Sequence, residues 1–246
     1  MKISGKTILL TGGSEGIGFE LARLLKDENT VIICGRNADK LAQAKKALPE
    51  IVTISADLSV AAQRNTLVDR VLSDFPQTSV LINNAGGRQV IDPQKRCGVE
   101  DALYSDFELN VLAPVLLCEN FLPHFRSQGA ATIVNITTGL IFLPKASYPF
   151  YCAAKAALHS YTQSLRWSLR ATPIRVHEVI LPLVNTPFHK GQLPGTVRAM
   201  DAAQAASLCL KELTRGTEEI SIGKARLARQ LAFLFPRKGI SLINRI

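Results

Sequence analysis

Short apolar runs alternate with amphipathic stretches along nearly the whole chain, and this alternation constrains the fold more than any other feature. The runs have the length of strands: Thr7–Leu10, Val31–Cys34, Ile51–Ser55, Val80–Ile82, Thr132–Ile136, Arg175–Ile180 and Glu219–Ile222. The stretches between them have helical spacing: Ile17–Lys26, Ala38–Leu48, Val60–Leu72, Tyr104–Leu122, Cys152–Leu169 and Arg198–Leu213. Several runs are apolar throughout, as strands covered on both faces are. The sequence therefore predicts an α/β fold, a doubly wound parallel sheet of about seven strands with helices on both faces.

The chain is expected to form a single domain over residues 1–246. Apolar residues make up 47% and charged residues 20%, which is the balance of a globular protein with a sizeable core. This balance excludes a disordered chain, a collagen-like chain and a disulfide scaffold. Neither a linker rich in Pro, Gly or Ser nor an internal repeat interrupts the pattern. A basic amphipathic extension begins at about residue 224.

The chain carries an excess of positive charge, with 29 basic and 20 acidic side chains. Residues 220–246 hold six basic side chains and no acidic one. A nucleic-acid-binding protein would show exposed aromatic residues among the basic ones or a known motif, and neither is found, so no nucleic-acid partner is expected. The charge indicates either an anionic ligand or surface, or an ordinary solvated surface.

Five cysteines are scattered without a CxxC pair, which indicates buried thiols in a reducing compartment and gives no metal-ligand spacing. No metal site is expected. No apolar run reaches the roughly 18–20 residues of a membrane span, and the first apolar stretch is too short for a signal peptide. These features predict a cytoplasmic protein.

The end of the chain has its own helical pattern. Leu227, Leu231, Leu234 and Phe235 recur on one helical face, and Pro236 is expected to end the helix. Two interpretations of this face remain open: packing on this subunit or its neighbour, closing the substrate site, or binding to an anionic membrane. Twelve residues are few for stable membrane binding, so packing is favoured and membrane association is not expected.

A glycine-rich turn follows the first predicted strand and opens the first predicted helix. Glycines at such a turn let the backbone bend sharply and approach a pyrophosphate, which the free N–H groups at the helix start then bind. The candidate residues are Thr11, Gly12, Ser14, Gly16, Ile17 and Gly18.

Tyr151 and Lys155 lie four residues apart, hence on one face of a helix that begins near Phe150. A lysine ammonium beside a phenol favours the phenolate and is expected to lower the phenol's pKa from its usual value near 10. Tyr148 lacks such a partner, because residue 152 is cysteine. The pair is therefore the candidate for proton transfer.

Three ordered motifs, TGxxxGxG from Thr11, the tetrapeptide Asn83–Gly86 (NNAG) and Tyr151-x-x-x-Lys155, together resemble those of the short-chain dehydrogenase/reductase family. The resemblance spans residues 4–222 and extends to a poorly characterised bacterial oxidoreductase subgroup. It implies a Rossmann-type sheet with strand order 3-2-1-4-5-6-7. It also implies hydride transfer between a nicotinamide cofactor and a carbonyl compound or secondary alcohol, with Tyr151 as proton donor or acceptor.

The resemblance assigns further roles. Thr138, thirteen residues before Tyr151, would hold the substrate carbonyl where the family usually has serine. Asn110 would hold a water connected to Lys155; Pro114, four residues later, removes the N–H partner of its carbonyl. The residues implied to contact the cofactor, besides the glycine-rich turn, are Arg36, Asp57, Leu58, Asn83, Ala85, Gly86, Tyr151, Lys155, Val184 and Thr186.

The second predicted strand ends without an acidic residue. Such an acid would bond the ribose hydroxyls of NAD, whereas Arg36 offers a planar cation suited to the 2′-phosphate of NADP. NADP is therefore expected over NAD. Glu15 departs from the family pattern, since NADP-binding relatives often carry a basic residue there.

Two functions remain open: an NADP-dependent oxidoreductase, or a dinucleotide-binding regulator or scaffold with a vestigial active site. Intact Asn110, Thr138, Tyr151 and Lys155 favour the enzyme. The candidate pocket residues are mostly apolar and aromatic, which indicates a moderately apolar carbonyl or alcohol substrate: Gly86–Gly98, Leu140–Phe150 and Phe188–Pro194. Residues 187–197 are expected to form a mobile lid in which His189 and Lys190 are solvated, and His159 is expected to be a packed core residue.

A homodimer or homotetramer is also expected, because two helices carry apolar faces beyond what the sheet can cover. Family members pair these helices across a two-fold axis. The residues of these faces are Leu103, Phe107, Val111 and Val115, then Leu158, Tyr161, Leu165 and Leu169.

Overall fold

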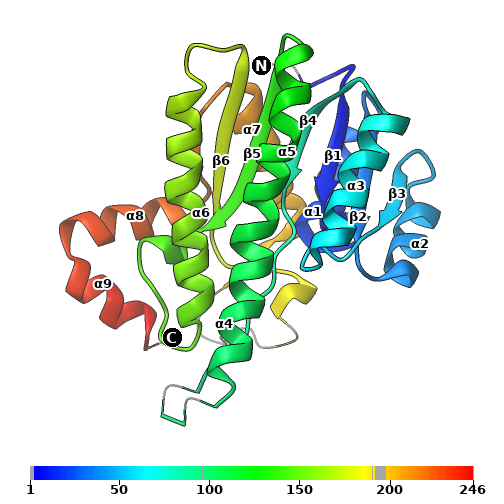
Figure 1. Ribbon diagram of the computed structural model, residues 1–246. Helices are drawn as coiled ribbons and strands as arrows, with labels where there is room; N and C mark the ends of the chain where they lie inside the picture. The colour runs from blue at the N-terminus through cyan, green and yellow to red at the C-terminus, as the bar shows by residue number, and fades with distance from the viewer. Residues whose placement is uncertain (1–2, 93, 96, 190, 192–197, 246) are drawn as a thin grey trace.

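Seven parallel strands form the central sheet in the order β3-β2-β1-β4-β5-β6-β9 (Figure 1). The computed structural model describes residues 3–92, 94–95, 97–189, 191 and 198–245. The strands of the sheet are β1 (Thr7–Thr11), β2 (Thr30–Gly35), β3 (Val52–Ser55), β4 (Thr78–Asn83), β5 (Ala131–Thr138), β6 (Ile174–Leu181) and β9 (Glu219–Ser221). Since β9 is the seventh strand of this sheet, the predicted fold class and strand order are confirmed.

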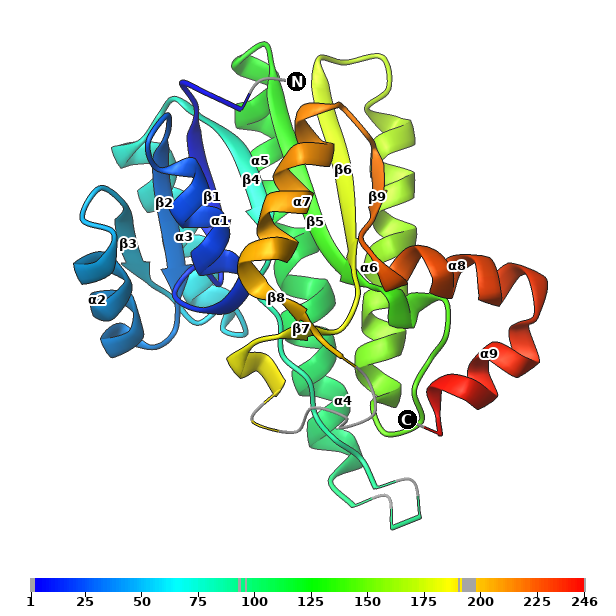
Figure 2. The same ribbon diagram turned by 180° about the vertical axis from the view of Figure 1, so that it is seen from behind.

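Helices cover both faces of the sheet, as Figures 1 and 2 show from opposite sides. They are α1 (Gly16–Leu25), α2 (Ala38–Ala47), α3 (Ala61–Asp74), α4 (Val99–Phe107), α5 (Ala113–Ser127), α6 (Pro149–Ser168) and α7 (Ala202–Thr214). One buried cluster joins α1, α2 and α7 to the sheet, and a second joins α3, α5 and α6 to its other face. Strands β1, β2, β4, β5 and β6 contribute apolar side chains to both clusters, as strands covered on both faces do.

The strand-to-helix connection after β6 differs from its prediction. Two two-residue strands, β7 (Val184–Asn185) and β8 (Met200–Asp201), pair with each other outside the main sheet. The α7 helix begins at Ala202 instead of Arg198, because the Asp201 carboxylate accepts hydrogen bonds from the N–H groups of Ala203 (2.9 Å) and Gln204 (3.1 Å). Strands of two residues have too few positions to show a periodic pattern.

The long helix predicted near Tyr104–Leu122 is divided. A π-helical segment, η1 (Glu108–Leu112), separates α4 from α5, and Pro114 occupies the first turn of α5. Proline cannot donate the backbone hydrogen bond that an α-helix needs here, so the local hydrogen-bond pattern changes. The change places the buried Asn110 inside the π-helical segment.

The end of the chain forms two helices, α8 (Lys224–Leu234) and α9 (Pro236–Ile243), where a single helix ending at Pro236 was predicted. On this subunit Leu227, Leu234 and Phe235 of the predicted face are exposed and Leu231 is half-buried, so most of the face is not packed on its own chain, while packing on a neighbouring subunit stays a prediction. The helices dock instead through small residues, Ala225 and Gly239, which are buried. A helical stripe of leucines shows that a helix is amphipathic but does not show which face contacts the protein.

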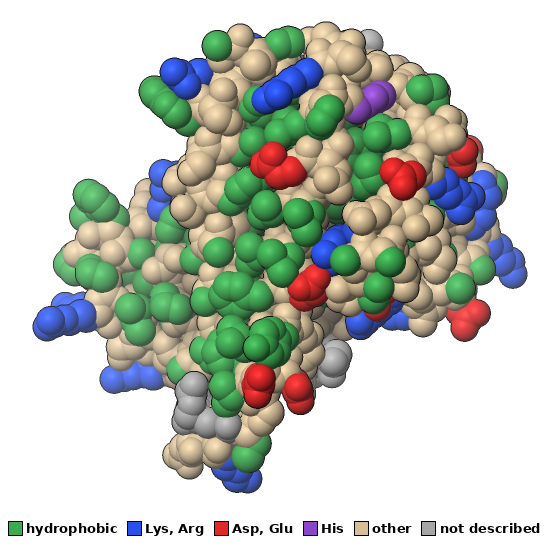
Figure 3. Space-filling model, in the orientation of Figure 1, with side chains coloured by type: hydrophobic (Ala, Val, Ile, Leu, Met, Phe, Trp, Pro, Cys, Tyr) green, Lys and Arg blue, Asp and Glu red, His purple; other side chains and the backbone are tan. Residues whose placement is uncertain are grey.

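The α6 face predicted for a partner subunit is also partly wrong. Leu158, Leu165 and Leu169 are buried in the core of this chain, because α6 lies on the sheet and presents them to it. On α4, η1 and α5 the predicted residues are half-buried, and Tyr104, Leu112 and Leu116 beside them are exposed. Figure 3 shows hydrophobic side chains gathered along this face.

Four of the five cysteines are buried and all are free thiols, while Cys97 is exposed. Within the described part of the chain, no helix combines the length and the apolar character that crossing a bilayer requires.

Candidate active site

The glycine-rich turn lies between the carboxyl end of β1 and the start of α1. Gly12 and Gly16 have φ angles of 65° and 58°, in the left-handed region that side chains disfavour. A Cβ atom on Gly18 would overlap the Gly12 carbonyl. Glu15 at the N-cap of α1 makes no side-chain cap bond, so no side chain occupies the first-turn N–H groups. Such a helix start suits a pyrophosphate.

Hydrogen bonds connect the residues after β4 directly to the glycine-rich turn. The Thr11 hydroxyl accepts hydrogen bonds from the N–H groups of Asn84 and Ala85, each 3.0 Å long. The Asn84 amide donates to the carbonyls of Thr11 and Gly12, also at 3.0 Å. Thr11, which was predicted to contact the cofactor, is buried. Its side chain therefore serves to fix the conformation of the turn.

The Asn83 side chain points into the interior, where its amide nitrogen donates to Asn135 Oδ1 (2.9 Å). Only its backbone is therefore directed toward a ligand. The side chain of the next residue, Asn84, holds the turn, because successive residues at the end of a strand face opposite sides.

Two charged groups flank the expected ribose position: Arg36, directly after β2, and Glu15, at the N-cap of α1. Arg36 is exposed, whereas Glu15 forms a 2.6 Å ion pair with Lys40. Burial raises the pKa of Asp57, but the Ser59 hydroxyl and N–H, helped by the Arg36 charge, outweigh it and hold the pKa below its ordinary value. Asp57 thus also orders the turn into α3, and Leu58 beside it is buried.

The segment after β6 closes over the glycine-rich turn. A Cβ atom on Gly16 would lie 3.2 Å from the Thr186 side chain. Val184 is buried in β7, so its contribution to a pocket is through the backbone. Thr186 and the α1 start therefore share one edge of the sheet, as predicted for residues that follow parallel strands.

Tyr151 and Lys155 are both buried on α6, next to the end of β5. The Lys155 ammonium donates a 2.9 Å hydrogen bond to the Ile136 carbonyl. Burial lowers the Lys155 pKa to about 8, while the Glu178 carboxylate opposes the shift.

The expected lowering of the Tyr151 pKa is not found in the chain itself. Burial raises this pKa above its ordinary value, and the groups that oppose the rise are the Arg88 charge and a hydrogen bond with Thr138. The Lys155 ammonium is hydrogen-bonded to the Ile136 carbonyl. At neutral pH the phenol is therefore protonated, which is the form that donates a proton.

Asn110 holds the turn after β4 in place. Its amide nitrogen donates to the carbonyls of Gly87 (2.9 Å) and Asp106 (2.8 Å). A Cβ atom on Gly86 would lie 3.0 Å from Asn110 Oδ1 and 3.7 Å from Lys155 Nζ. Asn110, Gly86 and Lys155 therefore converge, although no direct bond joins Asn110 to the lysine.

Sequence reasoning missed two residues of this site, Arg88 and Asp106. Asp106 is buried, accepts a hydrogen bond from the Gln89 N–H (3.1 Å), and has a pKa raised to about 6 by burial. Arg88 stacks on the ring of Tyr148. Arg88 was included in a predicted pocket range, but no spacing rule singles out either residue.

Part of the predicted lid is described. The Phe188 ring lies 5.8 Å from the Tyr151 ring, and His189 is half-buried against Phe188. His189 is thus not a solvated residue. Lys190 and residues 192–197 lie outside the described residues, so the lid prediction stays untested there.

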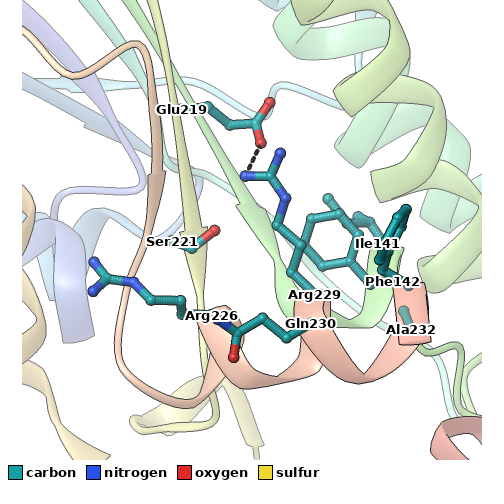
Figure 4. A pocket seen from close by; sticks show the side chains of 9 residues that line it. Ile141, Phe142, Glu219, Ser221, Arg226, Arg229, Gln230 and Ala232 are labelled. Atoms are coloured by element: carbon teal, nitrogen blue, oxygen red, sulfur yellow. Dashed lines mark ion pairs between the residues drawn. The ribbon is translucent and has the colours of Figure 1, made fainter. Parts of the chain in front are cut away.

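A separate hollow of about 820 Å³ lies between α8 and the segment after β5 (Figure 4). Arg229 extends across it to Glu219, forming a 2.7 Å ion pair. Glu219 lines this hollow, and its carboxylate and the ligand atoms of His159 and Glu178 all lie within 4.8 Å of one another. His159 is half-buried and lies 2.7 Å from Glu178, and Arg229 pairs with Glu219, so both acids already have protein partners.

Comparison with known proteins gives a family match. A model described as short chain dehydrogenase matches residues 6–195. The uncharacterized oxidoreductase DltE of Bacillus subtilis (strain 168) is 43% identical over 227 residues, covering 90% of this chain and 89% of that protein. The cis-4-hydroxycyclohexanecarboxylate dehydrogenase of Sinomonas cyclohexanicum is 31% identical over 207 residues, covering 81% of each chain.

Solved structures share the fold. A short-chain dehydrogenase from Burkholderia cenocepacia J2315 in complex with NADP has a TM-score of 0.85 at 23% identity, covering 99% of both chains. One from Sphingobium yanoikuyae in complex with NADPH has a TM-score of 0.80 at 24% identity, covering 96% of this chain and 95% of that one. One from Burkholderia phymatum in complex with NAD has a TM-score of 0.84 at 20% identity, covering 99% and 97%.

Proposed function

The chain belongs to the short-chain dehydrogenase family, and we propose that it is an NADP(H)-dependent oxidoreductase acting on a carbonyl compound or secondary alcohol. The observation that carries the proposal is that the buried Tyr151 and Lys155 lie on one face of α6, with Gly86 beside Lys155, at the edge of the sheet that holds the glycine-rich turn. A regulator or scaffold has no need to bury a phenol and an ammonium together, and burying them is costly.

The residues present fit a nicotinamide dinucleotide. The uncapped start of α1 would receive its pyrophosphate, with Gly12 and Gly16 giving the turn its left-handed backbone. Thr186, which overhangs Gly16, would contact the nicotinamide end together with the Val184 backbone. The bound cofactor supplies or accepts the hydride.

The chain's own residues would carry the proton. In the reducing direction, the protonated Tyr151 phenol donates its proton to the carbonyl oxygen, which the Thr138 hydroxyl holds. Lys155 places a positive charge near the phenol. Asn110 binds the Gly87 carbonyl and so fixes the backbone beside the reacting groups. Burial excludes water from these groups, which strengthens each interaction.

A direct test is a screen of ketones and aldehydes for loss of NADPH absorbance, run in parallel with NADH. The relative from Sinomonas is named for a hydroxycyclohexanecarboxylate, a secondary alcohol, which supports including cyclic ketones. Turnover of at least one ketone supports the enzyme. Tight NADPH binding without turnover of any carbonyl compound would favour the regulator or scaffold.

Arg36→Ala is expected to weaken NADPH binding by about 10–150-fold, the value of a charge-assisted bond to phosphate, while NADH binding stays nearly the same. The preference for NADP is proposed because Arg36 is exposed at the end of β2 while Lys40 neutralises Glu15. The NADP-bound neighbours agree with it, and the NAD-bound neighbour makes the measurement necessary.

Fluorescence titration of both cofactors against both proteins measures the effect. Arg215→Ala, which removes another exposed arginine at the end of α7, is the control and should leave both affinities unchanged. Equal affinities of the wild-type protein for NADPH and NADH would contradict the proposed preference.

We also propose a cytoplasmic homodimer or homotetramer; the free thiols suit a reducing compartment. Light scattering is expected to give two or four times the 26.8 kDa of one chain. The exposed α4–α5 face supports this, so Leu116→Glu should shift the protein toward the monomer. Leu24→Glu is the matched control, because Leu24 on α1 and Leu116 are each 39% exposed. A wild-type mass of one chain at micromolar concentration would rule out the assembly.

A further inference from the structure

Arg88 lies in the segment between β4 and α4, two residues after Gly86, and folds back over the start of α6. Its guanidinium carbon lies 4.0 Å from the centre of the Tyr148 ring and 5.7 Å from that of Phe188. The side chain is half-buried between these two rings. Three segments that are distant in sequence thus enclose one cation.

The charge of Arg88 has no anionic partner among the residues that the structure describes. Its Nη2 donates a long hydrogen bond of 3.4 Å to His189 Nδ1. Its Nε and Nη1 are shielded from solvent and make no hydrogen bond. A guanidinium withdrawn from water without a partner is costly, so an arrangement of this kind is expected to serve a bound anion.

The groups around Arg88 do not supply that anion. Burial and the Arg88 charge lower the pKa of His189, which keeps the imidazole neutral. Asp106 accepts its hydrogen bonds from the Gln89 N–H; the Arg88 charge lowers its pKa against the burial that raises it to about 6, but no ion pair joins the two side chains among the described residues. Tyr148 and Phe188 offer only ring faces.

The uncompensated cation is next to the proton donor. Phe188 contacts both groups, with its ring centre 5.8 Å from that of Tyr151 and 5.7 Å from the Arg88 guanidinium. The Arg88 charge also acts on the Tyr151 phenol. A small molecule whose carbonyl lies at Tyr151 would therefore have Arg88 within its reach.

We infer, given the proposed oxidoreductase function, that the substrate carries a carboxylate and that Arg88 binds it. The planar guanidinium matches a carboxylate in shape, and the rings of Tyr148 and Phe188 beside it hold the guanidinium in place. The sequence predicted a moderately apolar substrate. The inference refines this prediction, because the substrate would have an apolar body and one charged end. In an otherwise apolar pocket, a small number of polar groups fixes the orientation of the ligand.

The test compares keto acids with their uncharged primary amides, pair by pair, from pyruvate to 4-acetylbenzoate. The kcat/KM with NADPH is measured for each pair, and the affinities of both members are measured by calorimetry on the unreactive Tyr151→Phe protein loaded with NADPH. For at least one pair, the wild-type protein is expected to prefer the acid by about 10–100-fold, the value of a charge-assisted bond.

Arg88→Gln should reduce this preference to about one, and Arg88→Lys, which keeps the charge but loses the planar fork, should retain part of it. Arg170→Gln is the matched control. Arg170 also stacks on an aromatic ring, that of Trp167 at 4.3 Å, but at the far end of α6. Its removal should leave the preference as in the wild-type protein. Melting temperatures show whether each variant is folded.

The outcomes separate the two proposals. Turnover of the amides with no preference for the acids would overturn the role of Arg88 and leave the proposed reaction intact. Acid binding that depends on Arg88 without any turnover would support the anion site and count against the reaction. A preference for acids that survives Arg88→Gln, or no binding of any acid, would also overturn the inference.

Discussion

Replacing Tyr151 with phenylalanine is expected to lower kcat/KM by about 10²–10⁴-fold, the usual contribution of a general acid. The change removes one oxygen from a buried ring and leaves the contact with Phe188 in place. NADPH affinity should stay nearly the same, because the α1 start and Thr186 are untouched. The expected loss is therefore in the chemical step.

Steady-state kinetics with NADPH and cofactor titration together measure this difference. Tyr104→Phe is the control: Tyr104 is 66% exposed on α4, so losing its hydroxyl should leave kcat/KM as in the wild-type protein. A Tyr151→Phe protein that keeps most of its activity would disprove the assignment of Tyr151 as the proton donor.

The fold could be predicted from sequence because its strands are buried on both faces. The runs at β1 and β2 contain little besides apolar residues, and only a parallel sheet between two helical layers hides such strands completely. The end of the chain lacks this constraint. A stripe of leucines on α8 fits several packings, and the buried positions are Ala225 and Gly239, whose small size allows close approach.

The site was predictable only where chemistry depends on local spacing. Tyr151 and Lys155 are four residues apart on one helix, so their proximity follows from the helix itself. Arg88 depends on Tyr148 and Phe188, which are 60 and 100 residues away in sequence. Contacts of that kind arise from tertiary packing and cannot be predicted from the spacing of residues in one sequence.

Lys155→Met is expected to reduce kcat/KM by about 10²–10⁴-fold and to weaken NADPH binding as well. The lysine is almost completely buried, and its ammonium bonds the Ile136 carbonyl within the site. Methionine fills a similar volume without the charge, so the variant tests the charge and not the packing. Lys211→Met, at an exposed position on α7, is the control and should be fully active.

Stability should change in the opposite direction from activity. Burial lowers the Lys155 pKa to about 8 from an ordinary value of 10.5, so below pH 8 the folded state holds a charge that the unfolded chain solvates better. Removing that charge stabilises the fold, while the unpaired Ile136 carbonyl offsets part of the gain. The net gain expected at pH 7 is about 1–2 kcal/mol.

The sign of the pH dependence follows from the same shift. Above pH 8 the folded protein loses the Lys155 proton, and above 10.5 the unfolded chain loses it too, so the stability gained by Lys155→Met should shrink across that range. Thermal melts of both proteins at pH 7, 9 and 10.5 measure it. If the Lys155→Met protein is inactive but more stable at pH 7, the Lys155 charge serves catalysis at a cost in stability. A variant that is less stable at pH 7 and regains activity when stabilised would show that Lys155 serves the fold instead.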